Sequence, residues 1–368
     1  MKKKLREGYT TGTCAAAAAK AATYILLTGK KLLSVTQGTP EGRVLSLKVE
    51  NIQVSRESVS CGVRKDGGDD IDVTDGILVC AAVSRASHEG VSIDGGDGVG
   101  RVTKTGLDQP VGAAAINHVP RAMIRDSVAE AAGKCGYTGG IDVIIFVPGG
   151  EEIAGKTFNP RLGIRGGISI LGTSGIVKPM SEKALLDAIR IEMRMHRENS
   201  GTAICLTPGN YGEKFAFDFL KVDPEKEMQC SNFVGDALDM AAELGFEEVL
   251  FVSHIGKFIK VSGGIMNTHS HEADCRMELM AAAAIRAGAD AGLARNILDC
   301  NTTDDAVGLL SGQDGLLEKT MHEVMQRISF YLDQRCGGDI RTGAVVYSAV
   351  HGLLGKTDNA EAIIRELQ

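Results

Sequence analysis

Glycine is the residue that most constrains how this chain can fold. The chain has 368 residues, of which 46 are glycine, about one in eight, whereas proteins in general contain about 7% glycine. Glycine weakens helix and strand interiors but permits tight turns and close backbone contacts, so we expect many segments in which the backbone approaches another surface. Apolar residues at 43% and charged residues at 24% are typical of a globular protein, and the length predicts two domains.

The charge and the cysteines exclude several classes of protein. The 40 basic and 47 acidic residues give a net charge of −7, which offers no general attraction to nucleic acid or to an anionic membrane. The nine cysteines lie far apart without a Cys-x-x-Cys pair, so we expect reduced thiols rather than disulfides or a metal site. No apolar run reaches the roughly 18 residues of a membrane span. The sequence therefore predicts a soluble, cytoplasmic protein without a resident metal.

Residues 1–178 predict a glycine-rich α+β domain. An alanine-rich helix is expected at residues 15–22. Residues 44–54 alternate partly between apolar and polar side chains, as a half-buried strand does. Further short strands separated by glycine turns complete a pattern that favours an α+β domain over a regular β-α-β alternation.

Residues 179–368 predict a Rossmann-like α/β domain. Strands and helices are expected to alternate, with Ser181 and Ser231 as the N-caps of the first two helices. The expected helices cover residues 181–198, 231–244, 270–288, 315–336 and a short terminal segment, and the expected strands cover residues 202–207, 248–253 and 343–350. This alternation builds a parallel sheet whose ligands bind outside the carboxyl ends of the strands.

Two glycine segments imitate nucleotide-binding motifs. Residues Gly150–Thr157 match the phosphate-loop spacing, but that loop requires a helix directly after its Lys-Thr pair. Pro160 disfavours a helix there, so we expect a polar loop between strands rather than an ATP site. Residues Gly95–Gly100 lack the dinucleotide spacing. They predict either a turn or a loop that approaches a flat ligand, with Asp97 and Lys104 as its polar groups.

Two further segments are candidates for binding an anionic ligand. Residues 165–175 combine a strand-like alternation with glycines and hydroxyls, which suits either a buried strand or a carboxylate site beside Arg161 and Arg165. Three threonines precede the alanine-rich helix, and one of them is expected to be its N-cap. Their hydroxyls and the helix amides also suit an anion. These threonines are Thr10, Thr11 and Thr13.

Two segments of the second domain follow predicted strands and are expected at the carboxyl edge of its sheet. The first contains Pro208, Gly209, Asn210, Tyr211 and Gly212. The second contains His254 and Lys257. His254 and His269 are either ordinary surface histidines or reactive groups, and the residues around His269 do not define a metal geometry.

Taken together, these segments resemble the CbiD family of the anaerobic cobalamin pathway, the cobalt-precorrin-5B C1-methyltransferases. The resemblance rests on Leu5–Ala16, Asp69–Thr74, Gly98–Gly100, Thr103–Lys104, Ala115–Asn117, Asn159–Ile164, Gly166–Val177, His254–Lys257 and Asn267–Ser270. The order and the length fit across nearly the whole chain. The chain departs from the family pattern at Ile71 and His118, where proline is usual, and at Asp97, where glutamate is usual.

The resemblance implies transfer of a methyl group from S-adenosylmethionine to C1 of cobalt-precorrin-5B, which gives cobalt-precorrin-6A. Cobalt would enter only as part of this tetrapyrrole substrate, which we expect between the two domains. S-adenosylmethionine is expected near Pro208–Gly212. If the reaction requires a ring proton to leave the macrocycle, His254, His269 or Asp97 is expected to accept it. The expected partners of the substrate are Thr10, Thr11, Thr13, Lys104, Asn117, Arg161, Arg165 and Lys257.

Two other functions stay open at this point. One is a nicotinamide-dependent reductase of a tetrapyrrole intermediate, which the missing dinucleotide motif disfavours. The other is a non-catalytic corrinoid-binding scaffold. The sequence leaves open whether the chain forms a homo-oligomer. It also predicts that glycine-rich segments form walls against a large flat ligand, because aromatic residues make up only 4% of the chain.

Overall fold

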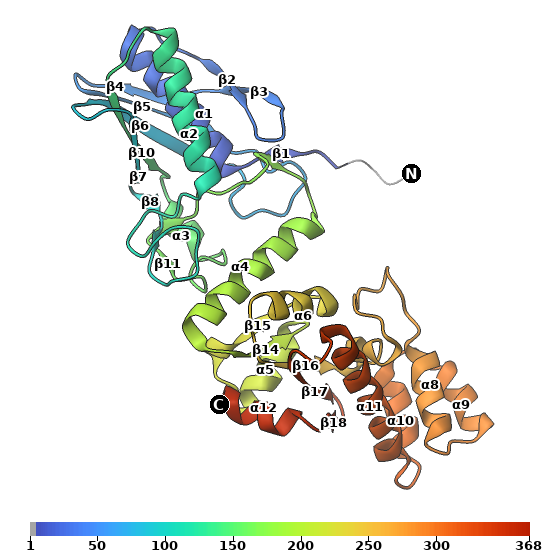
Figure 1. Cartoon of the computed structure of the whole chain (residues 1–368). Helices are drawn as coiled ribbons and strands as arrows, with labels where there is room; N and C mark the ends of the chain where they lie inside the picture. The colour runs from blue at the N-terminus through green and yellow to red at the C-terminus, as the bar shows by residue number, and fades with distance from the viewer. Residues whose placement is uncertain (1–4) are drawn as a thin grey trace. The chain divides into compact units, whose positions relative to one another are not determined.

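The computed structural model describes residues 5–368, except for the side chain of Asn210. The chain divides into two compact units, Met1–Glu182 and Lys183–Gln368, and each unit combines helices with β-sheet (Figure 1). The proposed division into domains at residue 178 stays a prediction. Within the described residues, no helix is long and apolar enough to cross a membrane.

The first unit contains a five-stranded sheet in the order β4-β5-β6-β10-β7. Its strands are β4 (Glu50–Val54), β5 (Ser58–Arg64), β6 (Leu78–Ala86), β10 (Gly140–Phe146) and β7 (Val91–Gly95). Strand β10 is antiparallel to β6 and parallel to β7. Helices α1 (Thr11–Thr28) and α2 (His118–Lys134) lie side by side and pack on this sheet (Figure 1).

Short strand pairs and one short helix complete the first unit. The pairs are β2 (Ser34–Gly38) with β3 (Val44–Lys48), β1 (Gly8–Tyr9) with β13 (Ile176–Val177), β8 (Gly98–Val99) with β12 (Gly167–Ile168), and β9 (Arg101–Val102) with β11 (Ile164–Arg165). Helix α3 spans Gly150–Ala154, and the next element is β11. No helix therefore follows the Lys-Thr pair of the phosphate-loop match, as predicted, although α3 itself replaces part of the expected loop.

The helices of the first unit extend beyond the sequence prediction. The expected alanine helix is confirmed and is longer, because α1 begins at Thr11 and buries its alanines completely. Helix α2 was missed, although Met123, Ile124 and Val128 recur at helical spacing and are buried. Proline is present in its first turn, where it breaks no intrahelical hydrogen bond.

Many glycines of the first unit pack against backbone rather than against open space. A Cβ atom on Gly98 would collide with the carbonyl oxygen of Val147, and one on Gly150 or Gly167 would collide with the backbone of Gly98. In the same way, a Cβ atom on Gly8 would collide with the backbone of residues 66–68, and one on Gly68 would collide with the backbone of residues 6–8. The expectation that these glycine segments are walls for a flat ligand is therefore wrong at these positions, since their missing side chains allow segments of the chain to contact one another.

The second unit contains a five-stranded sheet in the order β15-β14-β16-β17-β18. Its strands are β14 (Ala203–Thr207), β15 (Glu227–Gln229), β16 (Glu248–His254), β17 (Arg341–Ser348) and β18 (Gly352–Lys356). The first four strands in this order pair in parallel, and β18 is antiparallel to β17. The predicted parallel pairing of residues 202–207, 248–253 and 343–350 is therefore present.

Helices cover both faces of this sheet. They are α4 (Glu182–Ser200), α5 (Asn210–Phe215), the π-helical turn η1 (Ala216–Leu220), the 3-10 turns η2 (Pro224–Lys226) and η3 (Val261–Gly263), α6 (Val234–Glu243), α7 (Ile255–Phe258), α8 (Arg276–Arg286), α9 (Ala291–Leu298), α10 (Thr303–Ser311), α11 (Leu316–Cys336) and α12 (Ala360–Leu367). Val249 and Phe251 belong to one buried cluster, whereas Leu250 and Val252 belong to another with α12. Strands buried on both faces explain the continuous apolar runs.

Several details of the second-unit prediction are wrong. Ser231 is not an N-cap, because its backbone is left-handed with φ of 56° and α6 begins only at Val234. The helix expected at residues 270–288 begins at Arg276, after a loop. The strand expected at residues 343–350 ends at Ser348, and a tight turn leads into β18. Helices α9 and α10 were not predicted.

Candidate functional site at the carboxyl edge of the parallel sheet

The strand order places a topological switch point between β14 and β16. The chain passes from β14 to β15 on one side and then crosses to β16 on the other side, so the loops after β14 and β16 leave the sheet in opposite directions. In open α/β sheets with this order, ligands bind in the crevice outside the carboxyl ends of these two strands. Both predicted strand-end segments of the second unit lie here.

The loop after β14 contains the residues that were predicted to bind the methyl donor. Gly209 precedes α5, and Gly212 must be glycine because a Cβ there would lie 2.7 Å from the carbonyl oxygen of Val252. The side chain of Tyr211 is 82% exposed. Asn210 begins α5, but its side chain lies outside the described part of the chain.

Lys257 links the two loops across the switch point. Its ammonium group donates a hydrogen bond to the carbonyl oxygen of Pro208, and a Cβ on Gly209 would lie 3.6 Å from the same nitrogen. Partial burial lowers the pKa of Lys257 because the charged form loses hydration. The structure therefore brings Pro208, Gly209 and Lys257 together, as the sequence predicted for segments at one edge of the sheet.

His254 ends β16 and caps the short helix α7. Its Nδ1 atom accepts a hydrogen bond of 3.1 Å from the backbone N–H of Gly256. Its Nε2 atom lies 3.6 Å from Oδ2 of Asp304, and its ring meets the ring of Tyr347 edge-on at 5.7 Å. Burial lowers the pKa of His254 and Asp304 opposes this shift, so the imidazole is neutral at neutral pH.

Sequence reasoning missed the groups that surround His254. Asp304 lies in the first turn of α10, and its Oδ1 atom accepts a hydrogen bond of 2.6 Å from the hydroxyl of Ser348 at the end of β17. His351 lies in the following turn, with its Nε2 atom 3.3 Å from the carbonyl oxygen of Asp304. The one available signal was the Thr-x-x-Asp pattern at residues 302–305, which is typical of a capped helix start.

His269 lies in a separate loop before α8. Its Nδ1 atom accepts a hydrogen bond of 3.1 Å from the backbone N–H of His271, and the two rings are 4.8 Å apart. Buried Lys260 holds this loop by donating to the carbonyl oxygens of Thr268 and Ala273. Among residues 5–368, no group of three or more His, Cys, Asp or Glu side chains gathers to hold a metal ion.

The three threonines at the start of α1 use their side chains within the fold. Thr10 is the N-cap and accepts a hydrogen bond of 3.2 Å from the backbone N–H of Thr13. Thr11 accepts a hydrogen bond of 2.9 Å from the backbone N–H of Leu171, and Thr13 donates one of 2.8 Å to the carbonyl oxygen of Gly175. The buried hydroxyls of Thr11 and Thr13 therefore tie α1 to residues 171–175.

The other predicted residues of the first unit lie around β8 to β12. The Lys104 side-chain stem packs over Gly163, and Arg165 is an exposed residue of β11. Asp97 is exposed, and its carbonyl oxygen accepts a hydrogen bond of 2.8 Å from the backbone N–H of Val147. Two more predicted residues are Arg161, which is exposed in the turn before β11, and Asn117, the N-cap of α2 without a side-chain capping bond.

The Asn-Pro-Arg-Leu-Gly segment is anchored by a buried amide. The side chain of Asn159 donates a hydrogen bond of 3.1 Å to the carbonyl oxygen of Gly167 and accepts one of 3.0 Å from the hydroxyl of Ser169. These bonds hold residues 159–164 against β12. Asn159 thus fixes the backbone on which Arg161 and Arg165 stand.

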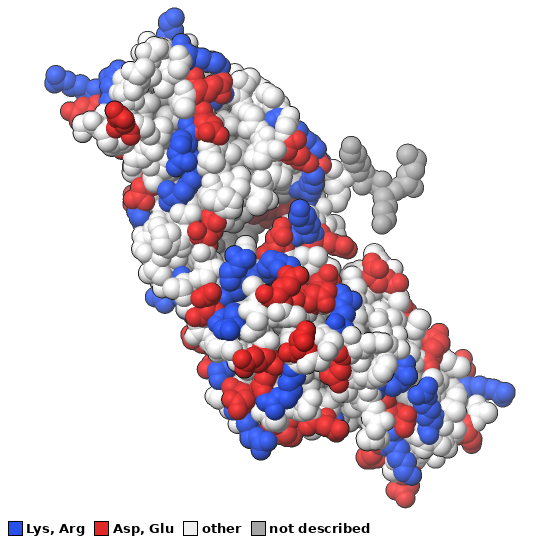
Figure 2. All heavy atoms as spheres, in the orientation of Figure 1, with Lys and Arg blue, Asp and Glu red and all other residues white. Residues whose placement is uncertain are grey.

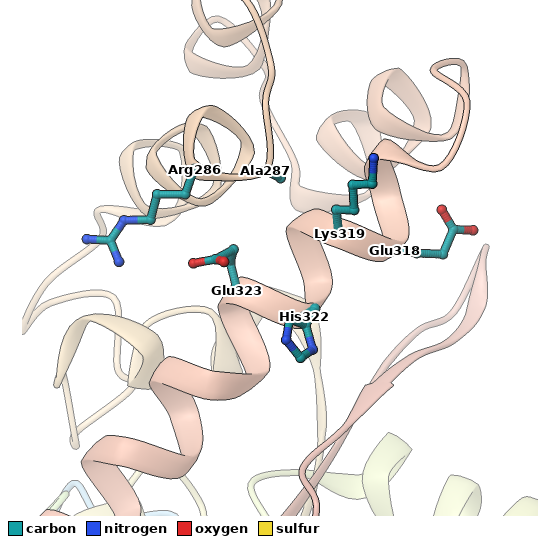
Figure 3. Close-up of a pocket in the computed structure, with 6 residues that line it drawn as sticks. All are labelled: Arg286, Ala287, Glu318, Lys319, His322 and Glu323. Atoms are coloured by element: carbon teal, nitrogen blue, oxygen red, sulfur yellow. The ribbon is translucent and has the colours of Figure 1, made fainter.

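The surface charge and two hollows in the structure do not coincide with residues that the sequence predicted as a site. Figure 2 shows acidic and basic side chains interspersed on the face that it displays. A hollow of about 410 Å³ lies between α8 and α11 and is lined by Arg286, Ala287, Glu318, Lys319, His322 and Glu323 (Figure 3). Another, of about 310 Å³, lies beside α5 and η1 and includes Glu213, Phe217 and Glu227. None of these lining residues was predicted from the sequence.

Comparison with known proteins identifies the family. Residues 1–179 match the family model described as CbiD, and residues 267–358 match the model described as CbiD, C-terminal domain. A protein of Ruminiclostridium cellulolyticum named cobalt-precorrin-5B C(1)-methyltransferase is 44% identical over 99% of this chain and 96% of its own length. A protein of Alkaliphilus metalliredigens with the same name is 42% identical over 100% of this chain and 96% of its own length.

A crystal structure of a cobalamin biosynthesis protein (cbiD) from Archaeoglobus fulgidus is 30% identical and matches 73% of this chain and 83% of that one, with a TM-score of 0.39. The family match and the names of the full-length relatives define the class, a methyltransferase of cobalamin biosynthesis. The chain belongs to the CbiD family.

Proposed function

We propose that this protein transfers a methyl group from S-adenosylmethionine to C1 of cobalt-precorrin-5B, which gives cobalt-precorrin-6A in anaerobic cobalamin biosynthesis. The observation that carries the proposal is the match to methyltransferases of this name over essentially the whole chain. The carboxyl edge of the second unit supports it, because Lys257 bonds to Pro208 across the switch point and His254, at the end of β16, lies 3.6 Å from the carboxylate of Asp304.

We place the methyl donor at the switch point of a doubly wound, Rossmann-like second unit. The residues present fit such a ligand. Gly209 has no side chain to obstruct it, and exposed Tyr211 offers an aromatic face. The carboxylate of Asp304 lies beside His254 at the carboxyl edge of the same sheet. The bound donor supplies a methyl group that its sulfonium already activates. The protein therefore has to align the two reactants and exclude water.

The substrate carries several carboxylates, which require cationic and polar partners. We assign this role to Lys104, Arg161, Arg165, Lys257 and Asn117. Thr10, Thr11 and Thr13 remain part of the proposed substrate region, because the Thr11 and Thr13 hydroxyls hold the backbone at residues 171–175 and Thr10 caps the same helix start. His254, His269 and Asp97 are the sequence-derived candidates for accepting a proton, and cobalt enters only inside the substrate.

We also infer the domain division and the cellular location of the enzyme. We assign residues 1–178 to the α+β domain and residues 179–368 to the Rossmann-like domain. We also assign the protein to the cytoplasm, because its cysteines lack the pairing typical of disulfide-bonded secreted chains.

Multiple-turnover methylation tests the function directly. Purified protein is mixed with S-adenosylmethionine and excess cobalt-precorrin-5B, and S-adenosylhomocysteine and the methylated corrinoid are quantified by mass spectrometry. We expect many equivalents of each product per enzyme. Tight corrinoid binding without turnover would instead identify a scaffold, and oxidation of NADH with the corrinoid would identify a reductase.

Donor binding tests the placement of the site. Labelled S-adenosylmethionine is used in equilibrium dialysis with the wild type, with Tyr211→Ala and with Tyr24→Ala as a control on α1. We expect weaker binding of about tenfold for Tyr211→Ala, since stacking contributes about 1 kcal/mol or more. Equal affinity of all three proteins would rule out this placement.

A further inference from the structure

The lone pair with which His254 would accept a proton is already engaged. The backbone N–H of Gly256 donates to Nδ1 at 3.1 Å, so Nδ1 carries no hydrogen. In a neutral imidazole the hydrogen then lies on Nε2, which faces Oδ2 of Asp304 at 3.6 Å. His254 in this arrangement turns its N–H toward Asp304 and has no free acceptor for a substrate proton.

Asp304 is directed to this cluster by the start of α10. The neighbouring Asp305 forms a capping box with Thr302, with bonds of 3.0 and 3.1 Å. Asp305 thereby caps the start of the helix. Asp304 takes no part in this capping, and its side chain lies toward His254 at the end of β16 and Ser348 at the end of β17. The side chain is partly buried, with 28% of it exposed, so part of Asp304 reaches the surface at the carboxyl edge.

Ser348 fixes the orientation of this carboxylate. The Ser348 hydroxyl accepts hydrogen bonds of 3.0 Å from the backbone N–H groups of Val350 and His351. Its own hydrogen is therefore free to point at Asp304 Oδ1, 2.6 Å away. One carboxylate oxygen is held by Ser348 at the end of β17, and the other lies 3.6 Å from Nε2 of His254 at the end of β16.

We propose that Asp304, rather than His254, accepts the proton that leaves the macrocycle during methylation, and that His254 is a positioning residue for Asp304. This inference rests on the proposed function. The S–CH₃ bond breaks and a C–CH₃ bond forms at C1, while one bond from hydrogen to the macrocycle breaks and leaves its electron pair in the ring. An O–H bond forms on Asp304, and nothing is oxidised or reduced.

The tautomer of His254 is tested first, on the free enzyme. Protein labelled with ¹⁵N-histidine is studied by long-range ¹H–¹⁵N correlation at neutral pH, with the His254→Asn variant to assign the signal. We expect a bare Nδ1 and a protonated Nε2. A protonated Nδ1 would overturn the inference without bearing on methyl transfer itself.

Matched substitutions then compare the two groups in turnover. His254→Asn keeps an N-cap oxygen for Gly256 and removes the imidazole, whereas Asp304→Asn keeps an acceptor for Ser348 and removes the carboxylate. We expect kcat to fall at least about 100-fold for Asp304→Asn and less than about tenfold for His254→Asn. An equal or larger loss for His254→Asn, or full activity of Asp304→Asn, would overturn the inference.

Chemical rescue separates catalysis from support of the fold. We expect added formate to restore part of the turnover of Asp304→Gly but not that of Asp305→Gly, which loses only the capping box. Failure of formate to rescue a folded, donor-binding Asp304→Gly would count against Asp304 as the acceptor. A wild type that does not methylate at all would overturn the proposed function, and this inference with it.

Discussion

The ammonium group of Lys257 donates a hydrogen bond to the carbonyl oxygen of Pro208, so that one side chain joins the loops after β16 and β14. Any ligand at this switch point meets a cation whose position is already set by the protein. The bond also gives a partly buried ammonium the acceptor that it needs.

Lys257→Met tests this cation as a substrate anchor. The methionine keeps most of the apolar stem and removes the charge. We expect the KM for the corrinoid to rise about tenfold, with a smaller decrease in kcat, because a charge-assisted hydrogen bond contributes about 1.5–3 kcal/mol. Steady-state kinetics measure the split, and equal decreases in kcat and kcat/KM would contradict an anchoring role.

The glycine contacts of the first unit predict a loss of stability at chosen positions. Gly98→Ala places a methyl group against Val147 and also strains a backbone with φ of 73°. We expect it to lower the free energy of unfolding by at least about 2 kcal/mol. Gly133→Ala is the control, because nothing lies within 4 Å of the new methyl group in α2, and it should raise stability by up to about 1 kcal/mol. Urea unfolding measures both.

The lowered pKa of His254 predicts a pH dependence of stability. Its folded-state pKa lies below the unfolded value of about 6.5, so the unfolded chain binds a proton first as the pH falls. The contribution is therefore fully present above about pH 6.5 and is lost on acidification through the folded-state pKa. The wild type should lose stability relative to His254→Asn in this range, as measured by urea unfolding at a series of pH values.

The pH dependence of stability that His88 contributes has the opposite sign to that of His254, so His88 serves as the comparison. Its hydrogen bond to Asp142 raises the pKa of this exposed ring. The contribution of His88 is present below about pH 6.5 and disappears as the pH rises through its folded-state pKa. A His88→Asn series with the same slope as the His254→Asn series would show that neither slope comes from the named contacts.

Replacing Asn159 should lower the stability of the protein because its side chain anchors the neighbouring segment. Asn159→Ala leaves the carbonyl oxygen of Gly167 and the hydroxyl of Ser169 without their partner. Such losses cost about 1–3 kcal/mol, and calorimetric unfolding measures the change. Exposed Asn301→Ala should change stability by less than about 0.5 kcal/mol. Equal changes in stability for Asn159→Ala and Asn301→Ala would contradict the anchoring role of Asn159.

Elements with a continuous apolar pattern could be predicted from the sequence. Strands β14 and β16 are buried along almost their whole length, and helix α11 has buried residues at helical spacing. Both are strong local signals. Ser231 shows the limit of this approach. It has a good capping side chain, but its left-handed backbone precedes the helix by three residues, and a local pattern of residue types does not reveal such a backbone angle.

The candidate site was predictable only in part. The loops with Gly209 and Lys257 follow predicted strands, and the parallel topology alone brings them together. Asp304 and Ser348 could not be placed beside His254, because these residues come from α10, β17 and β16 and meet only through the observed strand order. The prediction for Gly98, Gly150 and Gly167 was wrong because a sequence does not reveal whether a glycine faces a ligand or another part of the backbone.

The sheet of the second unit is bounded by β15, with three residues, and β18, with five. Short edge strands offer few unpaired backbone groups to another chain. The long apolar strands β16 and β17 lie inside the sheet, where their backbones already pair on both sides. This arrangement should resist strand addition and aggregation when the enzyme is concentrated, even though its central strands are among the most apolar segments of the chain.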